Sequence, residues 1–237
     1  MSNQLARGRL FTAAQRRFRT ARFRLIDRIV RALLEGREAV TILDAGGRPG
    51  YWKMLAPDLR PRTRITCLNT GAELELHAEA VEDLQIELAQ GDACAMPQYG
   101  DGAFDLVHSN SVIEHVGSYG DMQRFAAETG RVGRAYYHQT PDARFPIEPH
   151  YGVPLFHMLP DSLKARLFTR FDVGYARRCS FEEALSRIDR TRIVSRWVME
   201  RLFPDGTVRS ERVLMLPKST IVYRLPEGVR LPPPARR

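Results

Sequence analysis

The stretch Val40-Thr-Ile-Leu-Asp-Ala-Gly-Gly-Arg-Pro-Gly50 decides the fold of this chain of 237 residues. Its first half is aliphatic, as expected for a strand that is covered on both faces. Asp44 follows this apolar run, and the glycines after it lack the Cβ atoms that would keep a ligand away from the backbone. The stretch therefore predicts a buried strand, a ligand-binding loop and the start of a helix.

The spacing of these glycines narrows the choice of ligand. A dinucleotide-binding loop needs Gly-x-Gly-x-x-Gly, and neither of the first two glycines begins such a series. A Gly-Lys-Ser/Thr phosphate loop is also missing from the sequence. The pattern Asp44-x-Gly46-Gly47-x-x-Gly50 instead resembles the first motif of class I S-adenosylmethionine-dependent methyltransferases. The resemblance implies that this loop holds the amino-acid end of S-adenosylmethionine (SAM).

Three later segments continue this resemblance in the same order. Arg64–Asn69 is an apolar strand about twenty residues after the loop, where a βαβ unit places its ribose contact. The family usually has an acid there, whereas Asn69 offers a neutral amide, so Glu73 or Glu75 is an alternative ribose contact. Gly91-Asp92-Ala93 resembles the turn that contacts adenine, and Phe104–Val116 resembles the fourth strand and the helix after it. The implied cofactor-binding residues are Asp44, Ala45, Gly46, Gly47, Gly50, Asn69, Thr70, Asp92, Ala93, Asn110 and Ser111.

The second half of the chain resembles one branch of these enzymes. Residues 136–160 contain Thr140-Pro and Phe145-Pro-Ile-Glu-Pro-His150. Such segments occur in a bacterial branch of the type 11 methyltransferases, with Asp142 here in place of an Asn. The resemblance spans about residues 38–226. It implies an α/β fold: a Rossmann-like, doubly wound, seven-stranded and mainly parallel sheet with a terminal antiparallel strand and helices on both faces.

Length and pattern predict one catalytic domain with an extension at each end. We expect a basic amphipathic helical extension over residues 1–37, the methyltransferase domain over 38–226 and a flexible Pro/Arg tail over 227–237. Pro57 and Pro61 limit any helix after Gly50 to a short one. The predicted helices are Leu10–Leu34, Gly71–Leu84, Gly120–Arg131, Leu163–Phe171, Ser180–Asp189 and Val194–Leu202, and Thr207–Leu216 pairs with Ser219–Leu225.

The amino-acid composition limits the possible binding partners and the cellular compartment of the protein. The formal charge of +8 comes almost wholly from arginine spread along the chain, and no nucleic-acid-reading motif accompanies it. Arginines interleave with phenylalanines in the first helix, which favours peripheral contact with an anionic membrane or a lid over the domain. No apolar run suits a membrane span or a secretory signal. Three scattered cysteines are typical of a reduced, cytoplasmic chain.

Methyl transfer to a hydroxyl requires an aligned acceptor and a group that takes the hydroxyl proton. The candidates for this catalytic role are Glu148, His150 and His115, and those for acceptor binding are His138, Thr140, Phe145 and His157. Quinol methyltransferases bind a divalent metal through Glu-x-x-Glu-His at a position comparable to His115. Ser111 replaces the first of these acids, so no metal is expected.

The favoured hypothesis is O-methylation of a small-molecule, lipid-linked or sugar-linked acceptor. One alternative is an RNA methyltransferase that uses the basic surface, although Ser109-Asn110-Ser111-Val112 stands where base N-methyltransferases carry Asn/Asp-Pro-Pro-aromatic. A third hypothesis is a cofactor-binding partner protein without catalysis. Asn69 and the Arg48-Pro49 pair inside the loop favour it, and the many polar and aromatic groups of residues 136–160 disfavour it.

Overall fold

The computed structural model describes residues 2–71, 81 and 83–233, and the side chains of these residues from residue 18 onward. The predicted helix Gly71–Leu84 therefore lies largely outside the described residues. The strands are β1 (Val40–Ala45), β2 (Thr63–Asn69), β3 (Gln85–Gln90), β4 (Phe104–Asn110), β5 (Gly133–Pro141), β6 (Thr207–Val213) and β7 (Leu216–Arg224). The α-helices are α1 (Ser2–Leu33), α3 (Tyr119–Val132), α4 (Asp161–Arg170), α5 (Phe181–Asp189) and α6 (Arg196–Leu202).

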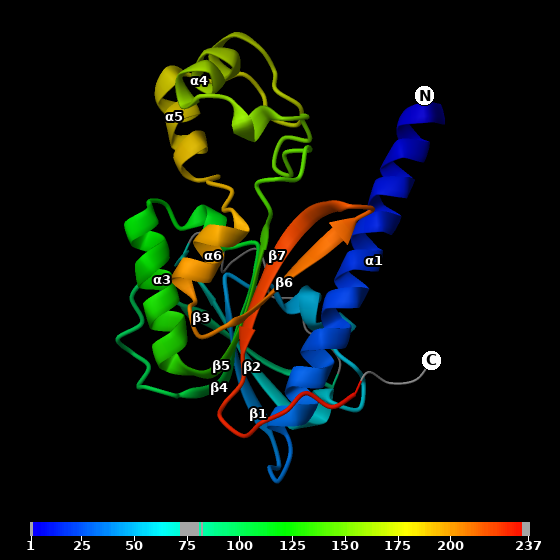
Figure 1. Cartoon of the computed structure of the whole chain (residues 1–237), viewed down its shortest axis with the longest axis vertical. Helices are drawn as coiled ribbons and strands as arrows, with labels where there is room; N and C mark the ends of the chain where they lie inside the picture. Colours follow the sequence, from blue (N-terminus) through cyan, green and yellow to red (C-terminus); the bar gives the residue numbers. More distant parts are fainter. Residues whose placement is uncertain (1, 72–80, 82, 234–237) are drawn as a thin grey trace.

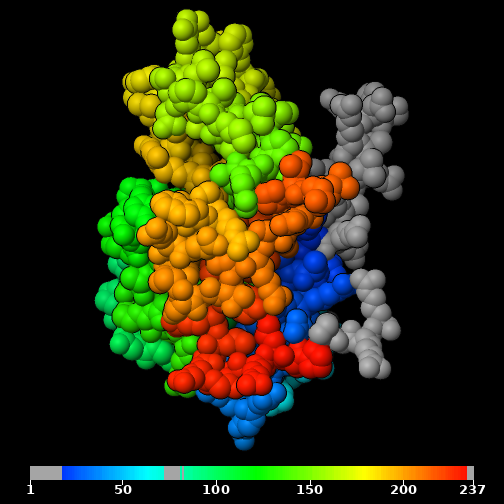
Figure 2. All heavy atoms as spheres, in the orientation of Figure 1, coloured from blue at the N-terminus to red at the C-terminus, as the bar shows by residue number. Residues whose placement is uncertain are grey.

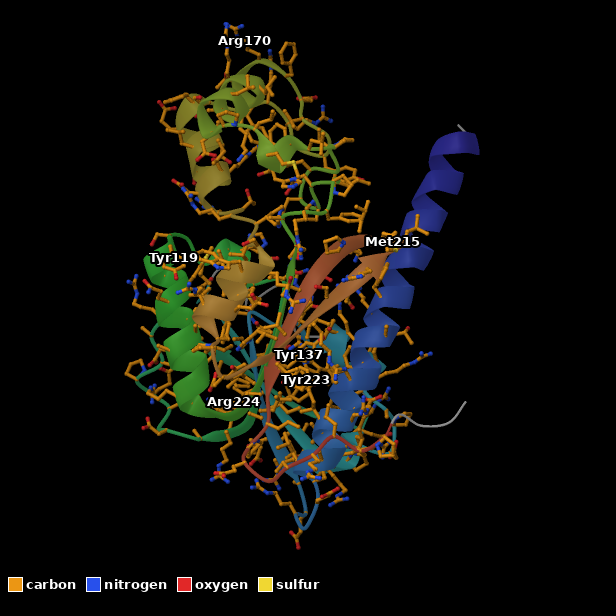
Figure 3. The ribbon with its side chains drawn as sticks, in the orientation of Figure 1. Tyr119, Tyr137, Arg170, Met215, Tyr223 and Arg224 are labelled. Atoms are coloured by element: carbon orange, nitrogen blue, oxygen red, sulfur yellow. The ribbon has the colours of Figure 1, made fainter. Side chains whose placement is uncertain are left out.

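The seven strands form one sheet in the order β3-β2-β1-β4-β5-β7-β6. β1 to β5 pair in parallel, and β7 pairs antiparallel with both β5 and β6. Tyr137 of β5 lies opposite Tyr223 of β7, and Figure 3 labels both near the middle of the sheet. The order reverses between β1 and β4, where open α/β sheets bind their ligands at the carboxyl ends of the strands. This architecture confirms the predicted fold class.

Helix α1 covers one face of the sheet and is part of the domain core (Figure 1). Phe23, Ile26, Ile29 and Leu33 of this helix are buried against the side chains that β1, β2 and β4 turn to this face. The second half of α1 is therefore not a separate extension, because its apolar stripe supplies one wall of the core. None of the described helices is long and apolar enough to cross a membrane.

Helices α3 and α6 cover the opposite face of the sheet (Figure 1). α3 begins at a capping box, in which Ser118 accepts from the Asp121 backbone and the Asp121 side chain accepts from the Ser118 backbone. Met122 and Phe125 of α3 and Met199 of α6 are buried on this face. Because every second strand residue points to the same face, the two helical layers bury alternate positions of each strand.

Residues 142–193 form a lobe with its own apolar cluster, which stands out above the sheet in Figure 2. Aromatic rings fill its centre, with Tyr151 and Phe156 each packed against Phe168 at ring-centre distances of 5.0 and 5.2 Å. Helices α4 and α5 supply most of the remaining apolar contacts. The sequence predicts both helices, but its local patterns do not indicate that they pack together as a separate lobe.

The segment after the glycine loop forms two short 3-10 helices, Pro49–Met54 and Arg60–Arg62. This confirms that no long helix follows Gly50, since prolines lack the backbone donors that a longer helix needs. One local prediction needs correction. The described part of the tail is not free of the domain. Leu231 packs against the core, and the Pro232 carbonyl accepts from Arg28 Nε at 2.7 Å.

Candidate active site

The glycine loop follows β1 at the carboxyl edge of the sheet, and its shape requires glycine at two positions. Gly46 has a φ of +72°, and a Cβ on it would lie 2.7 Å from a methyl group of Val112. A Cβ on Gly47 would lie 1.6 Å from Asp44 Oδ2. The backbone therefore approaches its neighbours more closely than any other residue allows.

Asp44 lies beneath this loop and is fully buried. Trp52 Nε1 donates to Asp44 Oδ2 at 2.6 Å, and His108 Nδ1 lies 2.6 Å from Asp44 Oδ1. Both oxygens are thus held by side chains of the loop segment and of β4. The carboxylate supports the loop from below, and the contact to the cofactor predicted for Asp44 stays a prediction.

Asn69, at the end of β2, joins the loop to the neighbouring strand. Its Nδ2 donates to the Gly47 carbonyl at 2.8 Å, whereas its buried Oδ1 has no partner among the described residues. Thr70 beside it is exposed. Asp92, predicted to contact adenine, is exposed after β3 and accepts from the Cys94 backbone at 2.8 Å. A buried acceptor without a donor fits a hydroxyl-bearing ligand, because such an atom is costly to leave unpaired.

Arg22 of α1 reaches the same edge and was missed as a site residue. Its guanidinium forms an ion pair with Glu211 at 2.7 Å and donates to Asn110 Oδ1 at 2.9 Å. Tyr51 Oη donates to the same Asn110 oxygen at 3.3 Å, and burial is the largest cause that raises the pKa of Tyr51. The sequence places Arg22 among the basic residues of a membrane-facing helix. The structure buries it, so that prediction is wrong for this arginine.

A second group of polar side chains lies after β4, on the segment that faces the lobe. Glu114 is fully buried, and its Oε2 accepts from Thr140 Oγ1 at 2.9 Å. Burial raises the pKa of the Glu114 carboxyl. His115 is exposed beside it, and its Nε2 lies 3.2 Å from Nε2 of His150. His150 in turn has its Nδ1 2.6 Å from Oε1 of the buried Glu148. The three predicted catalytic residues therefore come together, although they arise from two segments.

The predicted acceptor-binding residues fall in different places. His138 is fully buried, with Nδ1 2.8 Å from Ser109 Oγ, and it stacks on Tyr136 as a core residue. Thr140 faces Glu114 instead of open space. Phe145 is half-buried at the base of the lobe. His157 lines a cavity of about 370 Å³ in the lobe. Of the four, only His157 lies on this cavity.

Residues 43–135 match the family model described as "Methyltransferase domain". The chain is also similar to a solved SAM-dependent methyltransferase from Methanosarcina mazei, with 13% identity, a TM-score of 0.52 and coverage of 81% of this chain and 95% of that one. A protein from Pyrococcus horikoshii OT3 gives 16% identity and a TM-score of 0.54, with 80% and 82% covered. A possible exported protein from Bordetella parapertussis has 16% identity and a TM-score of 0.54, with 89% of this chain and 68% of that one covered. No curated protein sequence gave a significant match.

At such identities the solved structures establish the fold alone, whereas the family match assigns a methyltransferase domain to residues 43–135. The family match and the glycine loop support SAM as the methyl donor. The loop fits this cofactor, because Gly47 leaves no room for a side chain and Asn69 Oδ1 offers a free acceptor beside the loop.

Proposed function

We propose that this methyltransferase transfers the methyl group of SAM to a hydroxyl oxygen of a small-molecule, lipid-linked or sugar-linked acceptor. When bound, SAM supplies an electrophilic methyl group on a sulfonium sulfur. The observation that carries the proposal is the contact of 2.6 Å between Glu148 Oε1 and His150 Nδ1. A carboxylate at Nδ1 favours the tautomer with its proton there, which leaves the His150 Nε2 lone pair ready to accept the hydroxyl proton.

The residues at the glycine loop have the positioning role. The loop backbone from Gly46 to Gly50 would hold the amino-acid end of the cofactor, Asn69 Oδ1 would accept from a ribose hydroxyl and Asp92 would accept from the adenine amino group. Asp44 would keep the loop in place through Trp52. Fixed positions of this kind lower the entropy that must be lost before transfer.

The cavity in the lobe supports the proposal that the acceptor is a small or linked molecule. Its volume of about 370 Å³ lies in the range of small-molecule sites. Glu148 contributes to its lining and also contacts His150, so the cavity and the proposed proton acceptor share one residue. Asp161, Lys164 and Arg192 line it as well, which favours an acceptor with polar groups.

Isothermal titration with SAM and its demethylated product tests the cofactor part. Gly47→Ala is expected to weaken binding at least about 100-fold, since the new Cβ would overlap Asp44 and force the loop to move. Asp92→Ala should weaken binding if the adenine contact exists. Gly130→Ala in α3 is the matched control, because a Cβ there meets nothing within 4 Å. Equal affinity of the Gly47 variant and the control would contradict the cofactor assignment.

Methyl-labelled SAM, incubated with fractionated hydroxyl-bearing small molecules, lipids and glycans, tests the acceptor part. Mass spectrometry of the product identifies the methylated atom. His150→Ala should lower kcat by about 10² to 10⁴ while the SAM affinity stays unchanged. Arg170→Ala is the control within the same lobe, since Arg170 lies at its outer end (Figure 3). Methylation at nitrogen or carbon only, or an unchanged kcat of the His150 variant, would refute O-methylation with this base.

We also infer peripheral contact with an anionic membrane, which would suit a lipid-linked acceptor. The turn between β6 and β7 exposes Leu214 at 92% and Met215 at 82%, and Figure 3 shows Met215 beside α1, on which Arg19 and Arg24 are exposed. Apolar side chains next to basic ones are typical of interfacial binding. In flotation with vesicles that contain phosphatidylserine, a Leu214→Ser/Met215→Ser variant should bind less than Trp197→Ser. Equal binding of the two variants, or no binding at all, would contradict this contact.

A further inference from the structure

Two histidine nitrogens face each other beside the lobe without a proton to share between them. His115 Nδ1 lies 2.6 Å from the carbonyl oxygen of Arg190, which can only accept, so Nδ1 carries the proton. His150 Nδ1 lies 2.6 Å from the carboxylate of Glu148 and is protonated for the same reason. Each neutral ring therefore has its lone pair on Nε2, and these two Nε2 atoms are 3.2 Å apart. Two neutral rings repel in this arrangement, and either an added proton or a metal ion between or beside the two atoms relieves the repulsion.

A buried carboxylate oxygen lies next to the same pair. Glu114 is fully buried, and its Oε1 has no hydrogen-bond partner among the described residues, while Oε2 accepts from Thr140. One ligand atom each of Glu114, His115 and His150 lies within 4.8 Å of the other two. Three possible ligand atoms thus lie close together, and Glu114 Oε1 has no donor among the described residues.

Against the expectation from the sequence that no metal binds here, we propose that Glu114, His115 and His150 bind one divalent metal ion, for which zinc is the best match. Two imidazoles and one carboxylate are a ligand set of catalytic zinc sites, which keep a further position open. Zinc–nitrogen distances of about 2.0–2.1 Å in a tetrahedral site place two nitrogens about 3.3 Å apart, close to the 3.2 Å seen between the two rings. Magnesium and calcium fit less well because they prefer oxygen ligands.

The surroundings of the two rings support this assignment. Ligand histidines nearly always donate from their second nitrogen to a carboxylate or a backbone carbonyl, which fixes the tautomer and the ring orientation. His150 meets Glu148 in this way, and His115 meets the Arg190 carbonyl. Both outer contacts come from the lobe, so the lobe and the segment after β4 hold the proposed site jointly.

The consequence for catalysis rests on the proposed function, whereas the metal binding itself does not. An acceptor hydroxyl on the open metal position would lose its proton near neutral pH, as metal-bound water does. That proton then leaves to solvent, because the His150 lone pair is on the metal. The oxygen forms its bond to the methyl carbon as the carbon–sulfur bond breaks, and the sulfur keeps the electron pair. In the metal-free protein, His150 Nε2 takes the proton instead.

Metal titration of the full chain, first freed of metal with a chelator, tests the proposal. Calorimetry with zinc should give one site per chain, and cobalt should give the visible absorption band of a tetrahedral site. His115→Ala, His150→Ala and Glu114→Gln should each weaken zinc binding at least about 100-fold, and Glu148→Gln about 10- to 100-fold. His157→Ala, a histidine of the same lobe outside the cluster, should bind zinc like the unmodified chain. Circular dichroism checks that each variant is folded.

The absence of saturable binding up to about 1 mM zinc, equivalent to a binding free energy weaker than about 4 kcal/mol, would overturn the proposal. Zinc binding that survives the joint loss of His115 and His150 would also overturn it. SAM titration of the same samples separates this failure from a failure of the proposed function. A chain that binds SAM but no metal refutes the metal site alone, and a chain that binds metal but no SAM refutes the methyltransferase proposal alone.

Discussion

Two pairs of histidines lie at the carboxyl half of the sheet and differ in what surrounds them. His108 and His138 are buried within β4 and β5, while His115 and His150 lie where the sheet meets the lobe. The Nε2 atoms of the first pair lack partners among the described residues, and those of the second pair face only each other.

The neighbours separate the two pairs. His108 stacks on Tyr137 with ring centres 5.4 Å apart and an interplanar angle of 7°, and His138 lies between Tyr136 and Phe203. Aromatic faces offer no lone pair to a cation at Nε2. Around His115, by contrast, Glu114 and His150 direct lone pairs to one point. An unpartnered nitrogen therefore indicates packing when rings enclose it and a ligand site when other acceptors converge with it.

The largest effect expected in the buried region is that of Asp44→Ala. The change removes the acceptor of Trp52 and the partner of His108 in a dry environment, so we expect a loss of about 3–5 kcal/mol in the free energy of unfolding. Urea denaturation followed by circular dichroism measures it. Asp92→Ala, at an exposed acid, should cost less than about 1 kcal/mol. A loss below about 1 kcal/mol for the Asp44 variant would mean that the buried network carries little stability.

Acid titration should distinguish His138 from the histidines at the lobe. Burial, with His108 and Arg224 nearby, lowers the pKa of His138 to about 3, against an ordinary value of 6.5. Between these values the unfolded chain binds a proton that the folded chain excludes. Stability that is present above pH 6.5 is therefore lost as the pH falls toward 3, by an amount on the order of 5 kcal/mol.

His138→Leu should remove this part of the acid loss, because leucine fills a similar volume without a titrating group. Urea unfolding of the variant and the unmodified chain at several pH values between 3 and 7 measures the difference. If the two curves stay parallel, His138 is protonated in the folded chain, and the contrast between the two histidine pairs fails.

The smallest effect should come from His115→Ala in the metal-free chain. His115 is exposed and faces another lone pair, so its loss should change the free energy of unfolding by less than about 1 kcal/mol. Thermal unfolding with and without zinc provides the measurement. Zinc should raise Tm of the unmodified chain and not of the variant. A large loss without metal would show that this pair is structural as well.

The sequence predicts those structural features that depend on residues close together in the chain. Residues close together in the chain determine the strand, the acid and the glycine turn of residues 40–50. The same holds for the antiparallel strand pair near the end of the domain. Arg22 could not be placed in the same way, because a helical arginine becomes buried only when Glu211 and Asn110 arrive from distant strands. The partnership of His115 with His150 likewise joins residues 35 positions apart.

The chain enters and leaves the lobe at almost one point, since the Ala143 backbone donates to the Val194 carbonyl at 3.3 Å. Because the two ends of the lobe are adjacent and the lobe has its own apolar cluster, it can be replaced as a unit while the strands of the sheet stay as they are. Under the proposed function such an exchange would change acceptor binding, and the inserted segment would have to supply counterparts of Glu148 and His150. Grafting the corresponding segment of a related enzyme between these two residues offers a direct route to chimeras with altered selectivity.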